Sequence, residues 1–134
     1  MEVKTTEILR ERSWGSLEGR SAEYARNELK DAFAKFETLS EQEKFAFKFV
    51  EDMESFDEVL PRFITFIREL AVAYVGKTVL VVCHGGIMRG FLIHLGFGTH
   101  KEFSGRSIEN TGYFVLESDG VDFFVKETVG IYKK

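Results

Sequence analysis

An unbroken apolar run from Val79 to Cys83 constrains the fold of this chain more than any other feature. Lys77 and Thr78 open the run, and three of its residues are β-branched valines. A continuous run without polar alternation is typical of a strand that is covered on both faces. It is also far too short to cross a membrane. The run therefore predicts a buried strand, at residues 78–83, in a parallel sheet flanked by helices.

Helices are predicted before this strand. From about residue 21 to residue 39, apolar side chains recur every three or four positions, as on one face of a helix. Ser40 with Glu43, and Ser55 with Glu58, form two capping boxes, in which each side chain satisfies a free amide of a helix's first turn. We expect a helix of about ten residues after the first box and a long amphipathic helix after the second.

The rest of the chain predicts a short helix and a hairpin. Apolar residues recur at helical spacing over residues 87–95. Two strand-like runs, at 112–117 and 122–129, are joined by a Ser-Asp-Gly turn, which is a hairpin signal. Helices, a buried strand, a helix and a hairpin together predict a three-layer α/β sandwich with a mostly parallel central sheet. We expect residues 1–134 to form a single domain.

Composition limits the cellular location and the kinds of binding partner that we expect for this chain. The chain has 134 residues, 44% of them hydrophobic, which is enough to form a core. One cysteine excludes an internal disulfide framework, and no signal peptide pattern opens the sequence, so we expect a cytoplasmic protein. The net charge of −4 lacks the basic excess of nucleic-acid binders. We therefore expect neither a nucleic-acid partner nor a membrane partner.

Residues 76–112 differ from this acidic background. They carry four Lys or Arg residues against two glutamates, and they include all three histidines of the chain. A mildly positive, histidine-bearing segment suits an anionic small molecule. Ordinary variation of surface charge explains the same numbers equally well.

The junction at His84-Gly85-Gly86 is the strongest candidate site. Ligands of α/β sheets bind at the carboxyl ends of strands. The two glycines let backbone amides approach an anion, and the start of the following helix adds the positive end of its dipole. Because His84 can donate to phosphoryl oxygens, the pattern indicates an oxyanion or phosphate cradle. The alternative is that the glycines only permit a tight turn with His84 at the surface.

Cys83 and Arg89 offer a second chemistry at the same loop. Their Cys-x5-Arg spacing is that of cysteine-based phosphatases, in which a thiolate attacks phosphorus and the arginine holds the oxygens. The alternative, which we favour, is that Cys83 is a small buried core residue. Arg89 is then expected to anchor its helix or a nearby acid.

Three separate blocks of the chain carry a resemblance to a known family. Residues 9–19 read Leu-Arg-Glu-Arg-Ser-Trp-Gly-Ser-Leu-Glu-Gly, residues 51–90 include the predicted strand and the His-Gly-Gly junction, and residues 108–112 read Ile-Glu-Asn-Thr-Gly. In this order they resemble the acid-bearing loop, the second half and the C-terminal hairpin of the histidine phosphatase superfamily, which includes the cofactor-dependent phosphoglycerate mutases. The resemblance implies a phosphoglycerate mutase-like fold, and phosphomonoester hydrolysis or phosphoryl transfer.

The resemblance also implies roles for individual residues. Glu11 matches the general acid and base that protonates the leaving oxygen. His84 matches the second active-site histidine, which stabilises the phosphoryl group during transfer. The residues implied to bind substrate or phosphate are Arg12, Trp14, Gly85 and Gly86. The expected ligand is a small phosphorylated substrate or phosphate, and we expect neither a metal nor a cofactor.

Part of the family pattern is missing from these 134 residues. The family's opening strand ends in Arg-His-Gly, whose histidine is the nucleophile, and a Ser-x-Leu-x-Arg-Ala block supplies another arginine; neither occurs here. We therefore expect an N-terminally truncated domain, inactive by the family route unless the nucleophile segment is supplied. Because the strand at 78–83 then has an unpaired edge, we expect a homodimer or a partner chain that completes the sheet. The alternatives are a non-catalytic remnant that binds anions or a protein partner, and a phosphatase based on Cys83.

Overall fold

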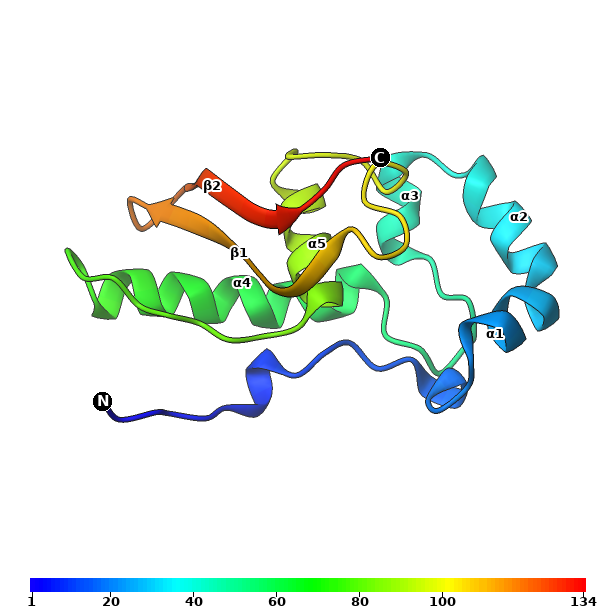
Figure 1. Ribbon diagram of the computed structural model, residues 1–134, viewed down its shortest axis with the longest axis horizontal. Coiled ribbons are helices and arrows are strands. Elements are labelled where there is room, and N and C mark those ends of the chain that lie inside the picture. Colours follow the sequence, from blue (N-terminus) through cyan, green and yellow to red (C-terminus); the bar gives the residue numbers. More distant parts are fainter. The chain divides into compact units, whose positions relative to one another are not determined.

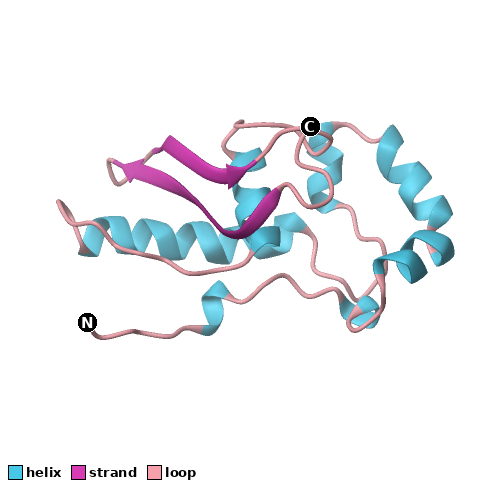
Figure 2. Cartoon of the chain, in the orientation of Figure 1, coloured by secondary structure: helices cyan, strands magenta, loops and turns pink.

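A computed structural model of the chain describes residues 1–134 (Figure 1). It is a mixed α/β structure with five α-helices and one two-stranded antiparallel sheet (Figure 2). The chain divides into two compact units, one of residues 1–11 with 60–134 and the other of residues 12–59. No helix is both long and apolar enough to span a bilayer. The expectation of a single domain over residues 1–134 stays a prediction.

The unit of residues 1–11 and 60–134 holds both strands. Its elements are the 3-10 turn Glu7–Leu9, the greater part of α4 (Phe56–Ala73), α5 (Gly85–His94), β1 (Ile108–Ser118) and β2 (Phe123–Ile131). The strands pair antiparallel, with Tyr113 opposite Val129 and Ser118 opposite Phe123. The predicted short helix and the predicted hairpin are both confirmed, and the hairpin's strands are longer than predicted.

Phe91 of α5 is the centre of the core of this unit. Its side chain is fully buried. Its ring centroid lies 5.2 Å from that of Phe63 on α4 and 5.7 Å from that of Phe123 on β2. One aromatic side chain therefore joins α4, α5 and the hairpin, and this packing places the start of α5 relative to the strands.

The predicted strand at 78–83 is wrong for this structure. These residues form an extended loop between α4 and α5, in neither a helix nor a strand (Figure 1). None of their backbone N–H or C=O groups hydrogen-bonds to another backbone group. Leu80 is 80% exposed and Val82 is 77% exposed. A strand forms only where a neighbouring backbone completes its ladder, and no other segment of the chain pairs with this one. Because segment 78–83 does not pair, the one sheet of the structure is the antiparallel hairpin, and the mostly parallel central sheet that the sequence predicted is not formed.

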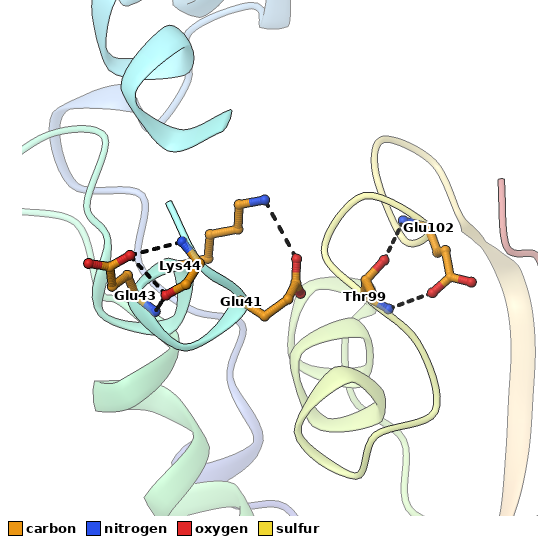
Figure 3. Close-up of polar contacts among 6 residues, drawn as sticks. Glu41, Glu43, Lys44, Thr99 and Glu102 are labelled. Atoms are coloured by element: carbon orange, nitrogen blue, oxygen red, sulfur yellow. Dashed lines mark hydrogen bonds and ion pairs between the residues drawn. The ribbon is translucent and has the colours of Figure 1, made fainter. Parts of the chain in front are cut away.

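Residues 12–59 form the second unit, which is helical. Its elements are the 3-10 turn Gly15–Leu17, α1 (Ala22–Glu28), α2 (Lys30–Thr38), α3 (Glu41–Ala46) and the start of α4. The single helix predicted near residues 21–39 is interrupted at Leu29, where φ is −110° and ψ is 27°. Both capping boxes are confirmed. Ser40 and Glu43 exchange hydrogen bonds at α3 (Figure 3), and Ser55 and Glu58 exchange them at α4.

Phenylalanine rings pack α2 against the chain that follows α3. The ring centroid of Phe36 lies 5.5 Å from that of Phe47 and 5.3 Å from that of Phe49. The ring centroid of Phe33, one turn earlier on α2, lies 4.6 Å from that of Phe49. The 14 phenylalanines of the chain therefore include a cluster that holds this unit together, since such ring pairs add to the free energy gained by burial.

Candidate functional site

The carboxylate of Glu11 lies at the first turn of α5. The amide of Gly86 donates to Glu11 Oε2 at 2.7 Å, across 75 positions of sequence. A Cβ atom at Gly86 would lie 2.6 Å from both carboxylate oxygens, so only glycine permits this approach. The structure thus brings together two of the residues that the sequence singled out, Glu11 and Gly86, within one unit.

Arg62 of α4 holds the backbone that carries Glu11. Its Nη1 donates to the carbonyl oxygens of Ile8 and Arg10, the latter at 2.9 Å, and its Nη2 donates to the carbonyl oxygen of Glu11 at 3.4 Å. One guanidinium thereby fixes the chain immediately before the carboxylate. This role of Arg62 was not predicted, and its only signal in the sequence is a cation next to Phe63 in the apolar stripe of α4.

His84 is the N-cap residue of α5. Its backbone is extended, with φ −126° and ψ 153°, and its side chain makes no capping hydrogen bond. The side chain is exposed. The helix begins with the hydrogen bond from the Met88 amide to the His84 carbonyl oxygen at 3.0 Å. The imidazole is therefore open to a ligand at the end of the helix where the dipole attracts anions.

The charge of Glu11 affects the pKa of Cys83 and the pKa of Arg89. Burial raises the pKa of the Cys83 thiol, and Glu11 adds to this rise while a hydrogen bond from the His84 backbone opposes it. Burial lowers the pKa of Arg89, and the charge of Glu11 opposes that fall. A nucleophilic cysteine needs a lowered pKa. The environment of Cys83 thus favours the interpretation of this residue as a packing residue, although it is only half-buried.

Arg12 and Trp14 belong to the other unit, that of residues 12–59. The guanidinium carbon of Arg12 lies 4.5 Å from the ring centroid of Trp14 and 4.2 Å from that of Phe56, within cation–π range of both. Arg12 is 5% exposed, so its charge is held among these rings. The expectation that Arg12 and Trp14 line a substrate mouth stays a prediction.

The start of α5 gathers groups suited to acid–base and oxyanion chemistry. A carboxyl group can give and take a proton, and an imidazole can donate to a charged oxygen. Glu11 and His84 provide these groups at the N-terminal end of α5, where the helix dipole is positive, and the Gly86 amide holds the Glu11 carboxylate there. No group of three or more His, Cys, Asp or Glu side chains is arranged to hold a metal ion.

A comparison with known families identifies the family of this chain. Residues 1–129 match the family model of the histidine phosphatase superfamily (branch 1). The chain therefore belongs to the histidine phosphatase superfamily, and the resemblance found in the three sequence blocks is confirmed. Among curated proteins, no individual sequence matches the chain. Membership implies the fold of that superfamily.

Proposed function

We propose that this chain is the acid-bearing part of a phosphomonoesterase. The observation that carries the proposal is the hydrogen bond between the Gly86 amide and Glu11, which holds a carboxyl group at the start of α5, two residues beyond His84. A phosphoryl group bound there meets the positive end of the helix dipole. Glu11 protonates the leaving oxygen, and His84 donates to the phosphoryl oxygens.

The nucleophile of this reaction comes from outside the 134 residues, because they contain no Arg-His-Gly. The segment 78–83 offers unpaired backbone donors and acceptors together with exposed Leu80 and Val82. Such an edge accepts another apolar strand. We assign this edge to a strand that ends in Arg-His-Gly and runs parallel to it. Parallel pairing places the incoming histidine at the carboxyl end of segment 78–83, beside His84, and it produces the parallel sheet of a three-layer sandwich.

The proposed reaction has two steps. In the first, a ring nitrogen of the incoming histidine bonds to phosphorus, the bond from phosphorus to the leaving oxygen breaks, and that oxygen takes the proton of Glu11. In the second, the oxygen of a water molecule bonds to phosphorus, the bond from phosphorus to the histidine nitrogen breaks, and the water gives a proton to the Glu11 carboxylate, so that phosphate and the free histidine are released. His84 stabilises the charge on the phosphoryl oxygens in both steps.

Hydrolysis of an aryl phosphate tests the proposal, with and without an added polypeptide that carries the family's opening strand. We expect turnover only with the added polypeptide. Glu11→Gln and His84→Ala then lower kcat by about 100-fold or more, since each removes one acid–base or charge-stabilising group. Cys83→Ser leaves kcat unchanged. His94→Ala is the matched control, because this exposed histidine ends the same helix.

Turnover that survives His84→Ala overturns the proposal. Binding of phosphate without turnover in the complemented protein identifies a non-catalytic remnant instead. Loss of turnover with Cys83→Ser alone identifies a cysteine-based phosphatase, and occupation of segment 78–83 by a second copy of the chain identifies a homodimer.

A further inference from the structure

The loop at residues 99–107, between α5 and β1, carries a local excess of positive charge. Lys101 and Arg106 are exposed on it, and neither forms an ion pair. The one acid of the loop, Glu102, is directed to its opposite end, where Oε2 accepts from the Thr99 amide at 2.8 Å (Figure 3). A loop with this charge attracts anions.

The residues that follow β2 add a further cation to this loop. The amide of Lys134 donates to the carbonyl oxygen of Glu102 at 2.9 Å. A second backbone hydrogen bond of the same length runs from Tyr132 to Ser107. These two bonds hold the chain after β2 along the loop. A Cβ atom at Gly105 would lie 2.9 Å from Lys134 Nζ, so the ammonium group lies against this glycine.

The backbone at Gly105 and Arg106 has open hydrogen-bond donors. Arg89 Nη1 donates to the Gly105 carbonyl oxygen at 3.4 Å, and because the peptide bond is trans, the Arg106 amide points away from Arg89. No hydrogen bond of the structure uses the amides of Gly105 and Arg106 or the hydroxyl of Ser104. All three residues are exposed, and Gly105 has φ +64°. Successive open amides in such a bend form an anion-binding concavity.

We propose that the bend at Ser104–Arg106 is a binding site for a phosphate dianion, either free or part of a small molecule. The donors are the amides of Gly105 and Arg106, the hydroxyl of Ser104, and the side chains of Arg106 and Lys134. Phosphate presents at least three oxygens and a charge of about −1.5 to −2. A carboxylate presents two oxygens and a single charge, so it matches this donor set less well. The site includes no residue to which the proposed function gives a catalytic role.

Nuclear magnetic resonance of the Gly105 amide in the full chain tests the site, during titration with inorganic phosphate at constant ionic strength. We expect a saturable shift. Arg106→Met and Lys134→Met should each raise Kd at least threefold, and the double variant at least tenfold. Both side chains are exposed, so we expect these variants to fold. Lys126→Met is the matched control, because it removes a cation of β2 that pairs with Glu117 at 3.5 Å, and it should leave Kd unchanged.

Three results would overturn the proposal. The first is an equal shift with acetate or sodium chloride in place of phosphate, which would indicate general screening of the cations. The second is a rise in Kd in Lys126→Met that equals the rise in Arg106→Met. The third is a Gly105 amide that does not respond to phosphate. A titration with phenyl phosphate identifies the source of the ligand, since tighter binding of the ester assigns the site to a phosphorylated small molecule and tighter binding of inorganic phosphate assigns it to the free ion.

His84→Ala separates this site from the candidate catalytic site. Phosphate bound at the start of α5 should shift the amides of Gly85 and Gly86, whereas phosphate bound at the loop should shift that of Gly105. We expect the Gly105 response to be unchanged in His84→Ala. Loss of that response would assign the phosphate to the start of α5 and would overturn the proposal. Absence of turnover in the complemented protein would overturn the proposed function and leave the Gly105 titration valid.

Discussion

The β1–β2 hairpin and the segment 78–83 have similar side chains and different structures. Both are rich in valine and other apolar residues. In the hairpin, Val115 pairs with Glu127 and Leu116 pairs with Val125. In the segment, no backbone group has a backbone partner. The comparison shows that β-branched composition makes a segment able to join a ladder, whereas the ladder itself requires a second strand within reach.

The two regions also differ in what covers their side chains. One face of the hairpin packs on α5, with the Phe91 ring centroid 6.2 Å from that of Phe114 and 5.7 Å from that of Phe123. The segment leaves Leu80 and Val82 mostly exposed. Because burial of apolar area is the main stabilising contribution, the hairpin contributes to the core while the segment contributes little.

Core truncation should give the largest difference between the two regions. We expect Phe91→Ala to lower the free energy of unfolding by about 3–5 kcal/mol, since it removes a fully buried ring from between α4, α5 and the hairpin. We expect Leu80→Ala to change it by less than about 0.5 kcal/mol, because that side chain is already in water. Urea denaturation measures both, and equal losses would contradict the comparison.

A pair of glycine substitutions should give the next largest difference. Gly130 in β2 has φ +67°, and a Cβ atom there would lie 3.1 Å from the Cα atom of Gly112. Gly76, just before the segment, has φ +72° with open space around it. We expect Gly130→Ala to cost about 2–4 kcal/mol, through backbone strain and crowding, and Gly76→Ala about 1 kcal/mol, through strain alone. Thermal unfolding followed by circular dichroism measures both losses, and equal losses for Gly130→Ala and Gly76→Ala would contradict the expected difference.

Association of the chain should depend on the segment and not on the hairpin. Without an added strand, we expect two copies to associate through the edge at 78–83. Leu80→Lys should weaken that association at least tenfold, or about 1.4 kcal/mol. Val121→Lys is the control, because Val121 is 70% exposed in the hairpin turn. Sedimentation over a range of concentrations measures the effect, and a wild-type chain that stays monomeric at high concentration would refute this expectation.

The smallest expected effect concerns the outer face of the hairpin. The hydroxyl of Tyr113 donates to Glu127 Oε1 at 3.0 Å, and this hydrogen bond raises the pKa of Tyr113 above its usual value. Its contribution to stability is present below the tyrosine pKa of about 10 in the unfolded chain, and it is lost as pH rises through the higher folded value.

Ultraviolet absorbance titration should therefore show Tyr113 ionising later than an unbonded tyrosine. Glu127→Gln should bring that step to lower pH. Glu117→Gln, on the same face, should leave it in place. If the titration curve of Glu127→Gln is identical to that of the wild type, the hydrogen bond from Tyr113 to Glu127 does not raise the pKa of Tyr113.

The features that were predicted correctly from sequence depend on neighbours in the chain. The capping boxes at Ser40 and Ser55 each need two residues three positions apart, and the hairpin needs a short turn between two apolar runs. Segment 78–83 was predicted wrongly because a strand also needs a neighbouring backbone to pair with, and no segment of the chain pairs with this one. The interruption at Leu29 escaped prediction because the apolar stripe continues through it.

The candidate site shows the same limit. The His84-Gly85-Gly86 junction is a local pattern and was visible in the sequence. Glu11 sits between two arginines and looks like a surface charge by itself, so only the family resemblance singled it out; its contact with Gly86 spans 75 positions. Arg62 could not be recognised, because it binds backbone carbonyl oxygens, which are the same for every residue type.

The absence of a side-chain cap at His84 has a consequence for how α5 is ordered. Most helices satisfy their first amides with a serine, threonine or aspartate at the N-cap, whereas the first turn of α5 receives the carboxylate of Glu11 from a distant part of the chain. That turn should then fray whenever residues 1–11 detach. The order of residues 1–11 and the order of the first turn of α5 are therefore coupled. Proteolysis of residues 1–11 should disorder the backbone at His84 before it disorders the rest of α5.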